Sequence, residues 1–266
     1  MAVSSNAPQS TAPSGRGRAP GLDRQAILDA ASALIERDGL AALSMRRLGR
    51  ELDVQAMALY RYVPGREHLI DWVVDLVVDE LYADPEVLLL PTGGWQDYLT
   101  RLAYGLRRMA LAHPHLFPLV ATRPPTAPWV RPPLRSLRWI ESFLAALSSE
   151  GFSDDTAVYA YRAFTGFLLG HLLLEVAARG VDISPVQGDE NTVEQPADPL
   201  QGYPTLRRLQ PNLARGDSRE EFEDSLANLM QRLEAAVMGD EHHPQTGAKR
   251  RPAETWLSER APREPV

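Results

Sequence analysis

The segment from Gln55 to Tyr62 carries side chains that can contact the base edges and phosphates of DNA. Burial of Leu59 and Val63 would leave its small, polar and aromatic residues exposed. Glutamine pairs with adenine, alanine and methionine contact the thymine methyl group, and phenolic hydroxyls bind phosphate oxygens. The residues that we expect on this surface are Gln55, Ala56, Met57, Ala58, Tyr60 and Tyr62.

Two short helices joined by a tight turn must position this surface. Ser44 is a good N-cap for a helix whose apolar residues Leu48 and Leu52 lie four positions apart. Asp53 follows at the point where the turn needs a residue that tolerates the left-handed conformation, and aspartate is among the more tolerant residues. Residues 43–63 therefore predict a helix-turn-helix, the motif that places its second helix in the major groove.

A further helix precedes this motif. Its apolar residues recur at intervals of three and four from Asp23 onward, and the pair Asp38 and Gly39 is typical of a helix C-terminus. We therefore expect a DNA-binding head over residues 22–66. Residues 1–21 are rich in Ser, Pro, Gly and Ala and predict a disordered arm, which is either a solvated tail or an additional phosphate contact.

The stretch over residues 22–82 resembles the N-terminal domain of the TetR family of bacterial transcriptional regulators. The resemblance rests on DGL after the first helix, on SMRRLGRELDV, and on LYRYV followed by GREHL. Asp53 replaces the glycine that is common in the family. Met57 and Ala58 form an unusual pair at the recognition positions, so the operator sequence of other members does not carry over to this chain.

This resemblance implies a role for each matching residue. Ser44, Met45 and Arg46 open the second helix against the DNA, Gln55, Ala56, Met57 and Ala58 face the bases, and Tyr60, Tyr62 and Arg66 hold phosphates. The chemistry agrees for Arg46, because an arginine can direct two donors at a guanine edge. The alternative for either tyrosine is packing within the small bundle.

Charge and composition agree with a DNA-binding head on an acidic body. The chain carries 28 basic and 35 acidic residues, but residues 16–66 hold nine Arg against six acidic residues. A basic end directs the molecule toward DNA.

With no cysteine, thiolate catalysis and disulfides are excluded. No nucleophile, acid–base pair or cofactor loop has a recognisable spacing, so we predict neither an enzyme nor a cofactor.

The residues after the head predict a larger helical body over residues 67–239, so we expect an all-α chain. The expected helices cover 66–82, 95–112, 115–121 as a short turn, 134–149, 153–178 and 219–238. Residues 181–204 predict a mobile loop and residues 240–266 a disordered tail. The apolar run FTGFLLGHLLLEVAA is interrupted by His171 and Glu175, so we expect no membrane span and a cytoplasmic protein.

The body also resembles, more weakly, the C-terminal domain of the tetracycline-repressor branch, through FLLGHLLLE and YPTLRRLQPNLARGDSREEFEDSLANLMQRLEA. This resemblance implies that two long helices form a four-helix interface with a second subunit, around a core that holds a small molecule. Gly166 and Gly170 lie four apart and permit close approach at that interface, or within one subunit as the alternative.

The effector candidates combine aromatic bulk with a few polar groups. They are His115, Arg138, Trp139, Tyr161, Arg162, Phe164, Phe167, His171 and Glu175. His171 and Glu175 lie one helical turn apart and predict a hydrogen-bonded pair rather than a metal site. The histidines near residues 113–115 and 241–243 lack the spacing of a structural zinc site, so no metal is predicted.

Together these features predict a ligand-responsive regulator that binds an inverted-repeat operator as a homodimer. A small, largely apolar effector would release the repressor from DNA. Two alternatives stay open at this point, a constitutive regulator without an effector and a DNA-tethered docking module that uses the 181–204 loop or the tail. Activation instead of repression is also open.

Overall fold

The computed structural model describes residues 22–87, 93–123, 127, 129–130, 136–183 and 200–241. The regular structure within these residues is helical, with no strand among them, which confirms the predicted all-α fold. The proposed arm, most of the proposed loop over 181–204 and the tail beyond residue 241 lie outside the described residues.

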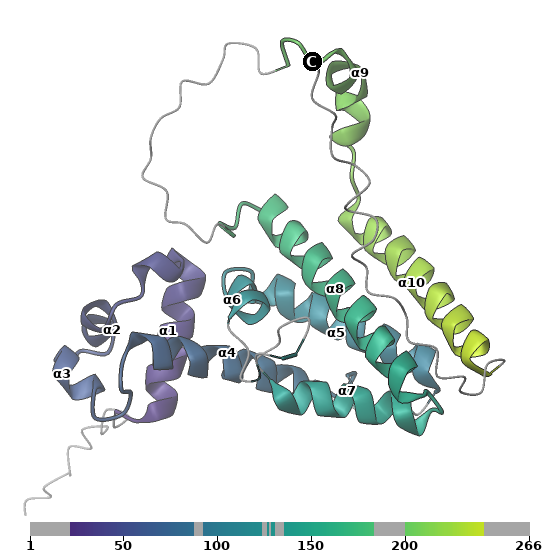
Figure 1. Ribbon diagram of the computed structural model, residues 1–266. Helices are drawn as coiled ribbons and strands as arrows, with labels where there is room; N and C mark the ends of the chain where they lie inside the picture. Colours follow the sequence, from purple (N-terminus) through teal and green to yellow (C-terminus); the bar gives the residue numbers. More distant parts are fainter. Residues whose placement is uncertain are drawn as a thin grey trace, which may run out of the picture.

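The head is a small bundle at the left of Figure 1. It contains α1 (Arg24–Asp38), the short 3-10 turn η1 (Leu40–Ala42), α2 (Met45–Glu51) and α3 (Ala56–Leu59). The predicted cap is present, since Ser44 Oγ accepts from Arg47 N, and Asp23 also caps α1 by accepting from the backbone of Ala26. The buried core of the head joins Ile27 and Ile35 to Leu48, Leu59 and Val63.

The body contains the longer helices. They are α4 (Arg66–Ala83), α5 (Trp95–Ala112), α6 (Phe117–Thr122), α7 (Leu137–Ser149), α8 (Asp154–Ala178), α9 (Pro204–Leu213) and α10 (Ser218–Glu241). The predicted bounds of α5 agree with those observed, whereas α6 and α7 begin two and three residues later than expected. Ser153 caps α8 as predicted by accepting from Thr156 N.

Helix α4 connects the two parts of the molecule. It packs against α1 of the head on one side and against α5 and α6 of the body on the other. Helix α8 contacts α5, α6, α7 and α10, so it forms the centre of the body (Figure 1). The core between α7 and α8 includes Phe143, whose ring lies 5.4 Å from that of Phe164 and 5.7 Å from that of Tyr161.

Two helices depart from the expectations. Helix α9 was not predicted, and it extends away from the body, with Tyr203, Leu206 and Leu213 exposed (Figure 1). Helix α8 is 25 residues long and apolar enough to meet the length and composition of a membrane span. Its buried face, which includes Leu168 and Leu172, packs against neighbouring helices, as expected for the central helix of a helical domain.

Candidate DNA-binding surface and effector pocket

The turn between α2 and α3 brings the two helices into close contact. Asp53 adopts a φ of 51°, which confirms the predicted left-handed residue. Val54 N donates to Gly49 O over 2.8 Å. A Cβ atom at Gly49 would lie 2.8 Å from Val54 O and 3.2 Å from Ala56 N, so only glycine permits this approach of α2 to the turn.

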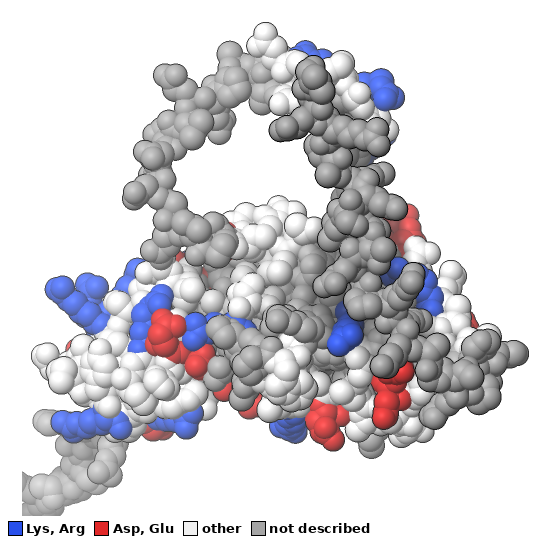
Figure 2. Space-filling view, in the orientation of Figure 1, with Lys and Arg blue, Asp and Glu red and all other residues white. Residues whose placement is uncertain are grey.

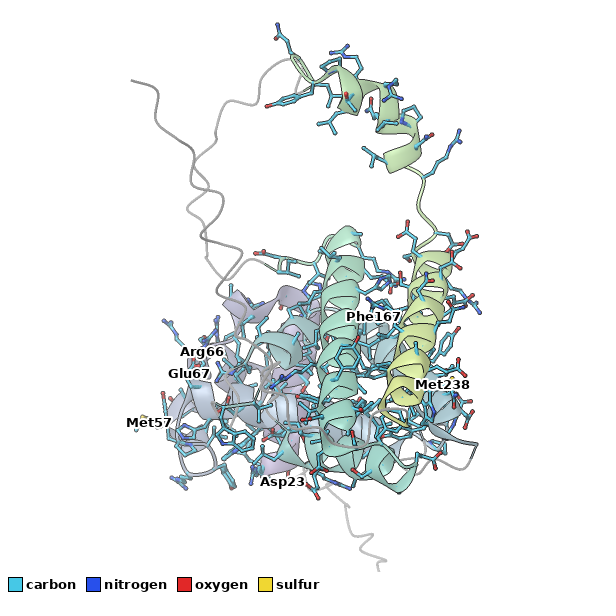
Figure 3. All side chains as sticks on the ribbon, turned by 45° about the vertical axis from the view of Figure 1, so that its right-hand side comes forward. Asp23, Met57, Arg66, Glu67, Phe167 and Met238 are labelled. Atoms are coloured by element: carbon cyan, nitrogen blue, oxygen red, sulfur yellow. The ribbon has the colours of Figure 1, made fainter. Side chains whose placement is uncertain are left out.

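The end of the head that α3 occupies is exposed. Met57 is 75% exposed, Tyr60 47% and Tyr62 40%, and Figure 3 shows Met57 at the outer edge of the head. Arg46 and Gln55 are exposed as well. Neither tyrosine is buried in the bundle, which weakens the packing alternative.

The head carries arginines of two kinds. Arg37 and Arg47 form ion pairs with Asp38, whereas Arg46, Arg50 and Arg61 make no ion pair with any residue that the structure describes. Figure 2 shows blue side chains on this end of the molecule. The sequence analysis did not select Arg50 or Arg61, although Arg61 stands between the two predicted tyrosines.

Two of the predicted DNA contacts, Met45 and Arg66, make contacts within the protein. Met45 is 8% exposed, because it lies three residues before Leu48 on the buried face of α2. Arg66 donates from Nε to Leu43 O over 2.9 Å and from Nη2 to Leu40 O over 3.1 Å. Arg66 therefore binds the backbone just before α2 while 37% of its side chain stays exposed, so these bonds compete with the predicted phosphate contact, which stays a prediction.

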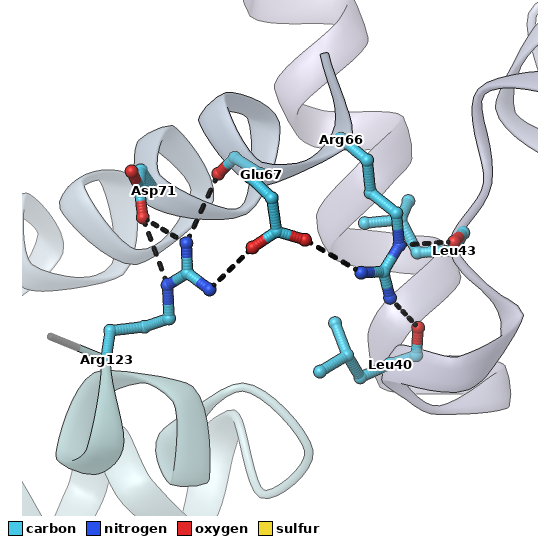
Figure 4. A network of polar contacts seen from close by, with 6 residues as sticks. All are labelled: Leu40, Leu43, Arg66, Glu67, Asp71 and Arg123. Carbon is cyan, nitrogen blue, oxygen red and sulfur yellow. Dashed lines mark hydrogen bonds and ion pairs between the residues drawn. The ribbon is translucent and has the colours of Figure 1, made fainter.

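A chain of charged contacts runs from α6 through α4 to this backbone (Figure 4). Arg123, at the end of α6, donates to Asp71 Oδ1 over 2.6 Å and to Glu67 Oε2 over 2.9 Å. The other oxygen of Glu67 accepts from Arg66 Nη1 over 3.1 Å. The hydrogen bond from Arg123 holds the pKa of Glu67 below its ordinary value, although desolvation opposes this shift. We call these residues, Arg123, Asp71, Glu67 and Arg66, the junction cluster.

A second connection joins α1 to the turn before α6. The carboxylate of Glu36 accepts from His115 N over 3.3 Å and from Leu116 N over 3.1 Å. His113 Nε2 lies 2.9 Å from Glu80 Oε2 on α4. Both ends of α6 are thus attached to the helices that carry the head, which mechanically links α6 to the DNA-binding surface.

The body contains an apolar hollow between α4, α5, α6, α7 and α8. Its described lining is Val74, Asp75, Val78, Leu81, Leu106, Met109, Phe117, Val120, Ser136, Trp139, Phe164, Thr165, Leu168 and Leu169. About 610 Å³ inside it is free of atoms, but this space includes open solvent, and only a small part of it is enclosed. We call this small hollow the slit.

The slit contains two of the nine predicted effector residues, Trp139 and Phe164. The other seven lie outside its lining. Arg162 is exposed, Tyr161 packs against Phe143, and Arg138 lies 4.1 Å above the ring of Tyr82. His115 contributes its backbone to the contact with Glu36. Those of the seven that lie on α8 are distributed over faces of the helix that meet α5, α7 and α10, and the assignment of all seven to an effector site stays a prediction.

Phe167, His171 and Glu175 belong to the seam between α8 and α10. Phe167 and His171 pack their rings against Phe222. Glu175 accepts from Arg107 Nη2 over 2.7 Å and from Ser218 Oγ over 3.0 Å, and not from His171, whose Nε2 has no hydrogen-bond partner among the described residues. The predicted pair of His171 and Glu175 is therefore wrong.

We call Arg107, Glu175 and Ser218 the buried cluster, since the side chain of Glu175 is 2% exposed and that of Arg107 is 13% exposed. Burial opposes ionisation of Glu175, but the hydrogen bonds from Arg107 and Ser218 outweigh it and hold the pKa of Glu175 below its ordinary value. This cluster connects α5, α8 and the first residue of α10.

Gly166 and Gly170 lie on the exposed face of α8, where a Cβ atom would meet nothing within 4 Å. Neither glycine mediates close packing with the described residues of this subunit, which weakens that alternative. Tyr159 and Leu174 are exposed on the same helix. This face of α8 has no covering helix in the part of the chain that the structure describes.

Comparison with known protein families gives two matches along the chain. Residues 27–73 match the family described as bacterial regulatory proteins, tetR family. Residues 89–237 match the family described as tetracyclin repressor-like, C-terminal domain. The first match ends within α4, and the second begins after it.

Individual proteins with similar sequence or structure agree with these matches. The HTH-type transcriptional repressor DrrR1 of Streptomyces coeruleorubidus is 32% identical over 157 residues, which span 58% of this chain but only 54% of DrrR1. A possible TetR family transcriptional regulator from Streptomyces coelicolor A3(2) superposes with a TM-score of 0.62 at 33% identity, covering 80% of this chain and all of that chain. The Streptomyces coelicolor protein ActR, in complex with actinorhodin, has a TM-score of 0.60 at 28% identity over 82% of this chain and 97% of ActR.

Proposed function

The chain belongs to the TetR family of bacterial transcriptional regulators, and from that membership we propose that it is a cytoplasmic, ligand-responsive repressor of transcription. It binds an operator through its head and leaves the operator when a small molecule enters the slit. The observation that carries this proposal is the linkage of an exposed basic head to an apolar slit through one short helix, α6.

The operator contact uses the exposed residues of the head. Arg46 lies at the start of α2, exposed and without an ion pair among the described residues, and is therefore ready to bind guanine or phosphate. Gln55, Met57 and the two tyrosines complete the recognition surface on α3 and its end. Arg50 and Arg61 join the phosphate contacts.

Two subunits bind together, with the exposed face of α8 at their interface. Gly166 and Gly170 allow a helix of the second subunit to approach closely there. The exposed side chains of Tyr159 and Leu174 would be covered in the dimer. Two-fold symmetry presents two copies of α3 to successive major grooves, so the operator is an inverted repeat.

Release follows from the small size of the slit. The slit is small, so binding of a compound with several rings would move the helices that line it. Phe117 and Val120 line it from α6, and the same helix ends at Arg123 of the junction cluster. Movement of α6 therefore shifts α4 and the head, and the effector favours the conformation that does not fit the operator. The complex of ActR with actinorhodin supports a small molecule as the signal.

Replacement of Arg46 by alanine tests the operator assignment. Loss of an arginine that contacts a base costs about 1 to 3 kcal/mol, or roughly fivefold to more than a hundredfold in operator affinity. The matched control is Arg219→Ala, which removes the same charge from α10, where Arg219 pairs with Glu223. Gel shifts at one stated salt concentration measure both variants, on an inverted repeat selected from random duplex DNA.

Equal operator affinity for the Arg46 variant, the Arg219 variant and the unmodified chain would contradict the assignment, provided that all three melt alike. The docking-module alternative has no observation in its favour, because the 181–204 loop and the tail on which it depends lie largely outside the described residues.

A further inference from the structure

One residue that lines the slit carries a buried donor with no partner among the described residues. Trp139 lines the slit and is 7% exposed, and its indole Nε1 has no hydrogen-bond partner among the described residues. A buried N–H without an acceptor is unfavourable, and a native structure rarely keeps one without a reason. An acceptor oxygen on a bound molecule would relieve this cost.

The rest of the described lining restricts the charge of that molecule. Ten of the fourteen described lining residues have apolar side chains without nitrogen or oxygen. Asp75 is the one charged residue among the fourteen. A charged group would leave water for apolar surroundings that offer no cationic side chain to an anion and only the exposed Asp75 to a cation. The lining thus favours a neutral compound.

The same lining offers little to a metal chelate. It supplies one carboxylate and no imidazole or thiolate, and no group of three metal-binding side chains occurs anywhere in the described part of the chain. A divalent cation carried into the slit would meet too few protein ligands to be held. The compound that binds therefore enters without a metal ion.

From these observations we propose that the effector is a flat, neutral ring compound that carries a ring carbonyl, accepts a hydrogen bond from Trp139 Nε1 and binds without a divalent cation. The small size of the slit favours a flat molecule, since a thin ring system demands the least separation of α6 and α7 from α8. This inference rests on the proposed function in one respect, that the slit is the effector site.

The test uses a matched pair of probes, 9-fluorenone, which has the carbonyl, and fluorene, which has the same rings without it. Calorimetry compares both on the full chain and on its Trp139→Phe variant, which keeps an aromatic ring and removes the N–H. We expect the substitution to weaken fluorenone binding about fivefold to tenfold and to leave fluorene binding unchanged, as for the loss of one neutral hydrogen bond. Trp129→Phe is the control, since Trp129 is 82% exposed and lies outside the lining.

Measurements on the unmodified chain keep the proposal testable even if the variant does not fold. The infrared carbonyl band of bound fluorenone should move to lower wavenumber than in a hydrocarbon solvent, because the carbonyl accepts a hydrogen bond. 9-Fluorenone-2-carboxylate should bind more weakly than fluorenone, and EDTA or magnesium should change neither affinity.

Several results would overturn the proposal: no fluorenone binding, an equal loss for both probes in Trp139→Phe, an unshifted carbonyl band, tighter binding of the carboxylate, or a requirement for magnesium. The operator gel shift separates this failure from failure of the proposed function. Fluorenone that binds as expected without weakening operator binding would contradict the role of the slit in release, while the ligand class would stand.

Discussion

The buried cluster and the junction cluster use the same chemistry, arginine against carboxylate, in opposite surroundings. Glu175 and Arg107 are enclosed between α5, α8 and α10, with 2% and 13% of their side chains exposed. Glu67 of the junction cluster is 63% exposed, while its partner Arg123 is 19% exposed. A network with one solvated carboxylate can rearrange at little cost, whereas the enclosed one cannot lose a partner cheaply.

This difference assigns the clusters to different tasks. The buried cluster fixes the helices that we propose for the dimer interface, so that the interface stays constant when an effector binds. The junction cluster connects elements that must change their relative position. Stability should therefore depend on the first, and communication between slit and head on the second.

The sharpest test of this contrast is Glu175→Gln. The substitution leaves the Arg107 guanidinium buried without a charged partner, and we expect the free energy of unfolding to fall by about 3 kcal/mol. Urea denaturation of the dimer at a fixed protein concentration measures the change. A loss below about 1 kcal/mol, the range of exposed pairs, would remove the distinction between the clusters.

The stability effect of Glu175→Gln should depend on pH. The folded protein lowers the pKa of Glu175 below its ordinary value of 4.5. The stability that the carboxylate contributes is therefore fully present above pH 4.5. It is lost as the pH falls through the lower pKa of the folded state. The stability difference between the unmodified chain and Glu175→Gln should thus be constant near neutral pH and shrink in acid. A difference that grows as the pH falls would show the opposite sign.

Ser218→Ala gives a smaller effect at the same site. It removes the hydrogen bond from Ser218 Oγ to Glu175 but keeps Arg107, and we expect a loss of about 1 kcal/mol. The melting temperature of the variant should lie between those of the unmodified chain and Glu175→Gln. If Ser218→Ala is as damaging as Glu175→Gln, the ion pair itself contributes little.

Glu67→Gln should have the smallest effect on stability, below about 1 kcal/mol, because its carboxylate is largely solvated. Its effect should appear in the position of the head instead. The chain has no cysteine, so a single Met57→Cys substitution allows specific spin labelling of the exposed head. We expect Glu67→Gln to broaden the distribution of distances between the two labelled heads of a dimer. Glu223→Gln, which breaks the exposed pair with Arg219 on α10, is the matched control. An unchanged distance distribution would contradict the proposal that the junction cluster positions the head.

Features encoded by neighbouring residues were predictable from the sequence. The cap at Ser44, the helix start at Ser153 and the left-handed Asp53 depend on local backbone chemistry, and all three are found as expected. The inward position of Met45 was readable too, since its spacing from Leu48 puts both residues on one face of α2.

Contacts between distant segments were not predictable in this way. Glu175 and Arg107 are 68 residues apart, and Arg66 binds carbonyls 23 and 26 residues earlier. Aromatic residues of α7 and α8 could be selected as candidates, but only the packing of α5 and α10 against α8 separates Phe164, which lines the slit, from Phe167, which does not.

The close approach of α2 to the turn at Gly49 has a consequence for altering the specificity of this protein. Gly49 permits no side chain, whereas Met57 and Gln55 contribute little to the core. A library randomised at positions 55 and 57 should therefore retain folded, soluble members across most of its diversity, while a library that includes position 49 should lose them. The head thus separates the residues that determine its architecture from those that natural or laboratory evolution can exchange to reach a new DNA sequence.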